Sequence, residues 1–290
     1  MQKQSSNPRS ARHPVFYTVD VEDYYHILGV KGTPPVTQWD SLPARVERGL
    51  ARHFDLLAEH GARATLFFLG YIARRFPHLV RKAVELGHEV ASHGFYHQEV
   101  RDMQRSVFEA DAADSRKLLE DLSGKEVRGW RSAGFTMGEG TPWFFSSLLE
   151  AGYAYDSSIV QNRPQHDTLF RGENRPTFLT TESGRICEFP ITMAEFGSLK
   201  INMFGGGYLR FFPAWLLGRA ASRELTRKPL LIYIHPRELD PGHPRLQMSI
   251  YRHFKSYVNL SGVPRKLTLL LGLAESLTLG EHYEQLLLQD

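Results

Sequence analysis

The sequence predicts one α/β domain built on a parallel β-sheet. Seven short apolar segments that are typical of strands alternate with segments of helical periodicity. Some of these strand segments are apolar throughout, as in ATLFFLG at residues 64–70, which indicates a parallel strand buried on both faces. The chain of 290 residues, 42% of them hydrophobic, can bury one large core. These observations favour a sheet that is either closed as a barrel or open and doubly wound.

The elements follow in a regular order. Strands are predicted at residues 14–19, 64–70, 88–93, 127–132, 153–158, 186–191 and 229–235. Helices are predicted at residues 43–61, 76–88, 106–124, 141–152 and 213–225. Pro77 should lie in the first turn of its helix, and Ser106 with Glu109 should form a capping box. Thr141 is expected as an N-cap, with Pro142 at the first helical position.

Composition excludes several classes of protein. The 35 basic and 32 acidic residues are interspersed, and the net charge of +3 gives no basic stripe for nucleic acid. The single cysteine, Cys187, excludes an internal disulfide and a cysteine-based zinc site. No apolar run approaches the ~20 residues that span a bilayer, and residues 1–13 are expected to be a disordered arm without a signal peptide. We therefore expect a cytoplasmic protein, for which a peripheral membrane contact stays open.

Polar residues follow the predicted strands where an active site would form. In a β/α barrel the carboxyl ends of the strands meet at one face. Those positions are Asp20, Glu22 and Asp23 after the first strand, His93 after the third, Arg131 in the fourth, Asp156 in the fifth and His235 in the last. His93 and His97 with one carboxylate would form a two-histidine, one-carboxylate metal site with open positions. The alternative is that His93 caps a turn and His97 lies at the surface.

The order of the motifs resembles a known family. TVDVED, ASHGFYH, WRSAGF, YDSS and LIYIHP resemble the five motifs of polysaccharide deacetylases, the nodulation-type domain of carbohydrate esterase family four. VDVEDYYH, EFPIT, GGGYLRFFP, HPRELDP and YVNL resemble its subfamily in exosortase (PEP-CTERM) exopolysaccharide loci. The resemblance implies a distorted (β/α)7-type barrel at residues 14–240. Residues 241–290 would then be a family-specific C-terminal extension that packs on the barrel.

The same resemblance implies roles for individual residues. Asp20 would be the catalytic base, Arg131 would orient it, and His235 would be the general acid. His93 and His97 would bind a divalent metal, most simply Zn²⁺, with Co²⁺ or Ni²⁺ as alternatives. Their carboxylate partner is either Glu22, which shares the strand face of Asp20, or Asp23. Contacts to the substrate are predicted for a further set of residues: Tyr24, Phe135, Asp156, Tyr208 and Arg210.

The resemblance implies a hydrolase that removes N-acetyl groups from amino sugars of a polysaccharide or a lipid-linked oligosaccharide. Metal-activated water, the Asp base and the His acid would carry the reaction. It would work in the cytoplasm or at the inner face of the membrane. Two alternatives remain open: a deformylase of a lipid-linked amino sugar, and a carbohydrate-binding pseudoenzyme that uses the same cleft.

Overall fold

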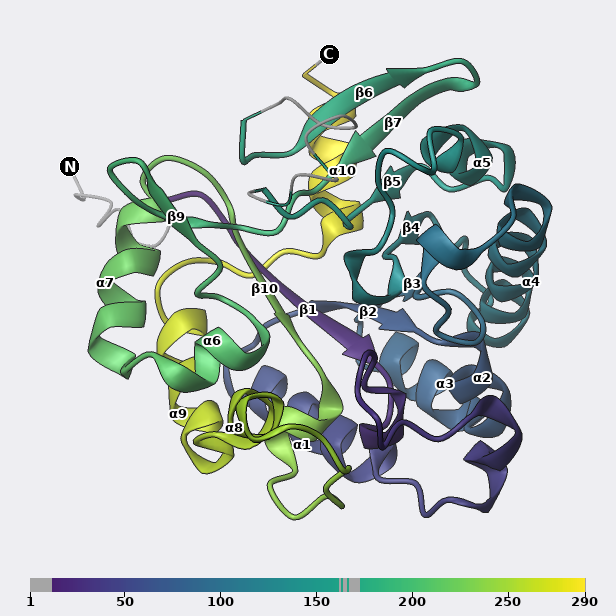
Figure 1. Cartoon of the computed structure of the whole chain (residues 1–290). Helices are drawn as coiled ribbons and strands as arrows, with labels where there is room; N and C mark the ends of the chain where they lie inside the picture. The colour runs from purple at the N-terminus through teal and green to yellow at the C-terminus, as the bar shows by residue number, and fades with distance from the viewer. Residues whose placement is uncertain (1–11, 162, 164–165, 167–172, 290) are drawn as a thin grey trace.

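The core of the molecule is one curled sheet of eight strands (Figure 1). The computed structural model describes residues 12–161, 163, 166 and 173–289, so most of the predicted arm at residues 1–13 lies outside the described residues. The strand order is β10-β1-β2-β3-β4-β5-β7-β6, and each neighbouring pair is parallel except β6 with β7. The strands are β1 (Val15–Val21), β2 (Ala64–Phe68), β3 (Glu89–Ser92), β4 (Gly129–Trp130), β5 (Tyr155–Asp156), β6 (Thr177–Thr181), β7 (Gly184–Glu188) and β10 (Leu230–Ile234). All seven predicted strands are confirmed.

Helices cover the outside of this sheet. They are α1 (Val46–Glu59), α2 (Gly70–Arg75), α3 (Pro77–Glu85), α4 (Arg105–Ser123), α5 (Phe144–Glu150), α6 (Gly206–Phe211), α7 (Ala214–Glu224), α8 (Ile250–Tyr257), α9 (Val263–Leu271) and α10 (Leu279–Leu287). The five predicted helices are present. The structure adds a two-stranded sheet of β8 (Ala194–Phe196) and β9 (Leu199–Ile201) that the sequence did not predict.

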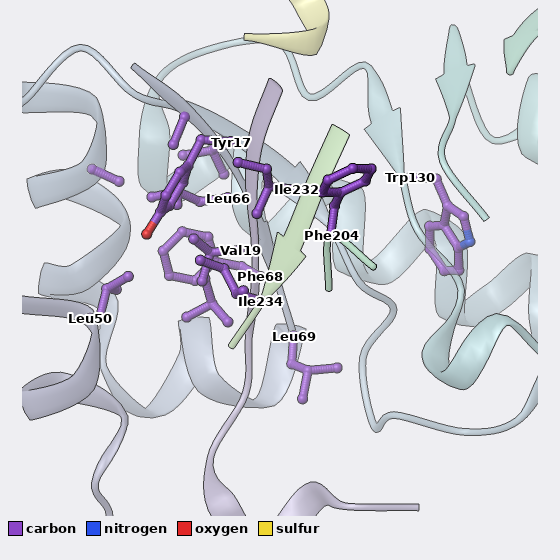
Figure 2. Packing of buried hydrophobic residues seen from close by; sticks show 14 of the residues in the cluster. Tyr17, Val19, Leu50, Leu66, Phe68, Leu69, Trp130, Phe204, Ile232 and Ile234 are labelled. Atoms are coloured by element: carbon purple, nitrogen blue, oxygen red, sulfur yellow. The ribbon is translucent and has the colours of Figure 1, made fainter. Parts of the chain in front are cut away.

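The two faces of β1 have different roles. Tyr17 and Val19 pack with Leu66 of β2 and Ile232 of β10 against the helices (Figure 2). Phe16, on the opposite face, belongs to a second apolar cluster with residues of β2, β3 and β5. Because side chains alternate along a strand, Asp20 lies on the same face as Phe16. The carboxylate is thereby directed into the barrel.

The sheet does not close by strand pairing alone. Thr192, which follows β7, accepts a hydrogen bond from Leu231 N (2.8 Å) and donates one to Pro229 O (3.3 Å) at the start of β10. A side chain thus connects the segment after β7 with β10, which are not paired by a ladder of backbone bonds.

The C-terminal segment covers the amino ends of the strands. Leu277 N donates to Val15 O (3.1 Å), and Leu279 N donates to Thr65 Oγ1 (2.8 Å). Gly280 N donates to the buried carboxylate of Glu89 at the start of β3 (2.9 Å). The opposite end, where β1 and β10 finish, is left for the site. None of the helices in the described residues is long and apolar enough to cross a membrane.

Two predicted helix caps are wrong. Helix α4 begins at Arg105 after Gln104, so Ser106 lies inside it, and Glu109 instead accepts hydrogen bonds from Arg105 and Ser147. Helix α5 begins at Phe144, because the hydroxyl of Thr141 is engaged with Gly138 in the preceding turn. Glu109 is thus engaged partly by a tertiary partner, Ser147, and Thr141 by a local turn.

Candidate active site

Asp20 is held at the carboxyl end of β1 by a buried arginine. Arg131 Nη1 lies 2.7 Å from Asp20 Oδ1 and 2.8 Å from Thr18 Oγ1. Its other nitrogens donate to the backbone carbonyl and hydroxyl of Ser157, at 3.0 and 2.9 Å, and the guanidinium lies 4.1 Å from the centre of the Phe67 ring. Burial raises the pKa of Asp20, but the charge of Arg131, with His93 and His235, outweighs it and holds the pKa below its usual value. Asp20 is therefore an oriented, ionised carboxylate.

The two predicted histidines lie on a tight loop after β3. His93 Nδ1 is 2.7 Å from the backbone oxygen of Arg131. Because a carbonyl oxygen can only accept a hydrogen bond, Nδ1 carries the proton. The other ring nitrogen, Nε2, therefore has a free lone pair that can bind a metal. Asp111 of α4 holds the loop by accepting from Phe95 N (3.0 Å). Gly94 has φ +76°, and a Cβ there would lie 2.9 Å from Asp111 Oδ1. His97 itself has φ +54°, a strained value that places its ring beside His93.

Glu22, His93 and His97 bring three ligand atoms together. These atoms lie within 4.8 Å of one another, and all three residues are buried. His97 Nε2 is 2.9 Å from Glu22 Oε2, and that buried oxygen has no other partner within the described residues. Burial raises the pKa of Glu22, but His97, His235 and Arg237 hold it well below the usual value. A buried carboxylate oxygen beside two imidazole nitrogens is a set of ligand atoms that fits a divalent cation.

Asp23 has a different environment. Its Oδ1 accepts from Tyr24 N (2.8 Å), and its Oδ2 accepts from Arg45 N (2.7 Å) and Val46 N (2.9 Å) at the start of α1. Both oxygens are thus used to join the loop after β1 to a helix N-terminus. Of the two carboxylates that the sequence left open, only Glu22 has its ligand atom beside the histidines.

His235 lies near the same carboxylate oxygen of Asp20 as His93 does. Its Nε2 is 3.9 Å from Asp20 Oδ2 and 3.4 Å from Glu22 Oε1, and His93 Nε2 is also 3.9 Å from Asp20 Oδ2. Glu238 accepts from His235 Nδ1 at 3.0 Å and is itself paired with the buried Arg210. The charges of His235 and Arg210 hold the pKa of Glu238 well below its usual value despite its burial. An ionised carboxylate therefore fixes the ring of His235.

The residues predicted to contact substrate are placed unequally. Tyr208 is exposed on α6, whereas Tyr24 and Phe135 are nearly buried and contact Tyr25 and Tyr233 respectively. Asp156 is fully buried and bonded to Ser158, and Arg210 is buried against Glu238. Asp156 and Arg210 therefore have partners inside the protein. For all five residues, contact with the substrate stays a prediction.

Sequence reasoning missed some of the supporting residues. Asp111 lies in the middle of a predicted helix, and Ser157 was noted only as part of a motif. Glu188 and Asp156 form a second buried pair in which burial raises the pKa of both carboxyls, that of Asp156 to about 6. No spacing in the sequence indicated these contacts, because each joins two different strands or a helix to a loop.

Together the fold and the site define a β/α-barrel protein with a candidate metal centre at the carboxyl ends of its strands. Residues 36–149 match the family described as polysaccharide deacetylase. Residues 157–283 match a family described as a domain of unknown function (DUF3473), which is that of the deacetylases of PEP-CTERM loci. The two matches share the eight-stranded sheet, since β2, β3 and β4 lie in the first and β6, β7 and β10 in the second. The match to the polysaccharide deacetylase family supports the resemblance that the sequence motifs indicated.

Curated relatives agree with the family match, and solved structures agree with the fold. A peptidoglycan deacetylase from Helicobacter pylori is 30% identical over 122 residues, 40% of this chain and 39% of that protein. A chitooligosaccharide deacetylase from Sinorhizobium fredii is 44% identical over 79 residues, 26% of this chain and 36% of that protein. The match thus spans well under half the length of either relative.

A structure assigned as a polysaccharide deacetylase from Mycobacterium smegmatis has a TM-score of 0.65 at 18% identity, covering 98% of this chain and 93% of that chain. An allantoinase has a TM-score of 0.61 at 15% identity, covering 96% of this chain and 92% of that chain, so these structures share the fold alone.

Proposed function

We propose that this protein removes N-acetyl groups from amino sugars of an oligo- or polysaccharide with the help of a divalent metal. The observation that carries the proposal is the position of two proton-transfer groups around one ligand cluster. Asp20 Oδ2 and His235 Nε2 lie 3.9 Å apart, and both groups adjoin the cluster of Glu22, His93 and His97. The names of the relatives, which are deacetylases of peptidoglycan and chitooligosaccharide, support the substrate class.

Each group has a defined task in this proposal. Glu22, His93 and His97 would hold the ion, most simply Zn²⁺, which when bound polarises an amide carbonyl and makes water more acidic. Asp20 accepts the proton of the attacking water, because Arg131 keeps it ionised and fixes its orientation. His235 donates a proton to the departing amine, and Glu238 stabilises the imidazolium that must be present for that step.

Some backbone N–H groups of the loop after Arg131 are already bonded within the protein. Ser132 N donates to Ser158 Oγ at 2.8 Å, and Phe135 N donates to Ser132 O at 3.2 Å. A divalent cation held by Glu22, His93 and His97 would supply positive charge for the negative charge that develops on the amide oxygen.

Release of acetate measures the proposed activity. Purified protein is incubated with acetylated and formylated amino-sugar oligosaccharides, with and without a chelator, and its metal content is measured in parallel. We expect acetate release that a chelator abolishes and that Asp20→Asn reduces by at least about 10³-fold while the metal stays bound. Full activity in Asp20→Asn would refute the role of Asp20. Release of formate but not acetate would make the protein a deformylase, and release of neither by the metal-loaded protein would favour a binding protein.

A further inference from the structure

Basic and acidic residues are interspersed over most of the chain, but two segments contain basic residues alone. Residues 196–223 and 241–274 contain nine of the 35 Lys and Arg residues and none of the 32 Asp and Glu residues. The rest of the chain therefore carries more acidic than basic residues, although the whole chain is nearly balanced. These two segments contain α6, α7, α8 and α9, which Figure 1 shows grouped beside β10. The fold thus gathers an excess of positive charge on one side of the molecule.

Large apolar side chains are exposed on the same elements. Ile250, Tyr251 and Trp215 are 91%, 70% and 69% exposed. Tyr208, Phe211 and Phe254 are exposed as well, and the rings of Phe211 and Phe254 lie 6.2 Å apart between α6 and α8. Only Tyr257 of α8 is buried, so the helix is anchored at its end and keeps its apolar side chains outside. We call these six exposed residues the apolar face.

Basic side chains accompany the apolar face. Lys255 of α8 lies with Nζ 5.0 Å from the centre of the Tyr208 ring. Along α7, Trp215, Arg219 and Arg223 are all exposed and follow one another at intervals of four residues, so they share one side of the helix. Aromatic and aliphatic side chains next to cations are typical of proteins that lie on an anionic bilayer.

The apolar face adjoins the candidate active site. Tyr208 and Phe211 are exposed on α6, while Arg210 of the same helix points inward to Glu238, which holds His235. Helix α8 is joined to the loop after β1 because Arg252 donates to Leu28 O at 2.6 Å. A surface that touched these helices would lie beside the carboxyl ends of the strands.

We propose that α6, α7 and α8 dock this protein on an anionic lipid bilayer. Resting on the proposed function, this places the site beside the lipid surface and points to amino sugars carried on a membrane-anchored lipid as the substrate class. A second copy of the chain fits less well, since two such faces would repel each other through their unbalanced charge. Nucleic acid also fits less well, because Ile250, the most exposed of the six residues, cannot stack on bases.

Vesicle sedimentation with the full chain tests docking without any use of catalysis. The probes are phosphatidylcholine vesicles with and without phosphatidylglycerol, at low and high salt. One variant removes apolar contacts (Ile250→Ser, Tyr251→Ser and Phe254→Ser), and a second reverses charge (Arg219→Glu and Arg223→Glu). Matched controls make the same kinds of change elsewhere, with Val107→Ser and Leu288→Ser for the first and Arg81→Glu and Lys82→Glu for the second.

We expect binding that needs phosphatidylglycerol and weakens with salt. Each variant should lose at least about tenfold in affinity, while the controls bind as the unmodified protein does and all variants keep the same rate on a short soluble oligosaccharide. Absence of vesicle binding, or equal loss in the controls, would overturn the proposal. Self-association abolished by the same variants, or tighter binding to single-stranded oligonucleotide than to vesicles, would overturn it too. A protein that binds vesicles but releases no acetate would contradict the proposed function alone.

Discussion

The choice between Glu22 and Asp23 leads to a sharp prediction, because two isosteric substitutions at neighbouring positions should have opposite effects. Glu22→Gln removes a ligand atom from the cluster with His93 and His97, so we expect metal affinity to fall by more than about 100-fold. Asp23→Asn leaves that cluster intact. The two carboxylate oxygens of Asp23 together accept hydrogen bonds from three backbone N–H groups. Asparagine has an NH₂ group in place of one of these oxygens, so at least one backbone N–H loses its acceptor.

The size of the Asp23→Asn effect follows from those hydrogen bonds. A hydrogen bond to a charged group contributes about 1.5–3 kcal/mol. Burial raises the pKa of Asp23 in spite of its three donors, so removing the charge recovers some desolvation energy. We therefore expect a loss of about 1–2 kcal/mol in the free energy of unfolding, a fall in Tm of roughly 2–8 °C.

Two measurements on each variant separate the effects. Metal binding is measured by calorimetric titration, and thermal unfolding is followed with and without added metal. Asp23→Asn should unfold at a lower temperature and still be stabilised by metal, whereas Glu22→Gln should lose that stabilisation. Loss of metal binding in Asp23→Asn with full retention in Glu22→Gln would refute the reasoning.

Three further predictions concern the support of the site and the acid stability of the fold. Glu238→Gln should lower kcat by about 10–100-fold with KM unchanged, measured by acetate release, because His235 loses the charge that fixes its ring; a change in KM alone would contradict this role. Gly94→Ala should weaken metal binding, whereas Gly87→Ala, at a similar φ of +78° with no atom near its Cβ, should cost only stability; equal metal affinity in both would count against the loop geometry. Burial lowers the pKa of His53 to about 4, below its usual value, so the unfolded chain binds the proton more tightly. Its contribution to stability is complete above pH ~6.5 and falls by up to about 3 kcal/mol as the pH drops toward 4; thermal unfolding of His53→Gln across that range should show a weaker dependence on pH.

The parallel strands were the easiest part of the fold to predict. The long parallel strands β1, β2 and β10 are buried on both faces, so each is a continuous run of apolar residues. Such a run can be recognised without knowing which strands pair with it. The antiparallel strand β6 is only half-buried, and the short hairpin of β8 and β9 lacks a continuous apolar run, so neither stood out. The two helix caps were wrong because the Thr141 hydroxyl bonds Gly138 in the preceding turn and the Glu109 carboxylate bonds Arg105 and Ser147.

The candidate site was predictable where residues follow strands and unpredictable where they meet across the fold. Asp20, His93 and His235 each end a predicted strand, and the topology alone brings them together. The alternation of side chains along β1 correctly favoured Glu22 as the neighbour of the histidines. The partners of Asp23 are Arg45 and Val46, at the start of a helix beyond a long connection. No pattern within the strand could reveal them.

Tyr208 and Arg210, which were both predicted to contact the substrate, lie on a helix that the sequence did not predict. A run of three glycines at residues 205–207 precedes both side chains. In the structure these glycines permit close contact, since a Cβ at Gly205 would lie 2.0 Å from the Tyr233 ring, and the segment forms α6. Residues two apart on a helix point about 200° from each other. Tyr208 and Arg210 therefore face opposite sides of α6. Because Arg210 points inward to Glu238, which holds His235, Tyr208 is exposed on the outer surface.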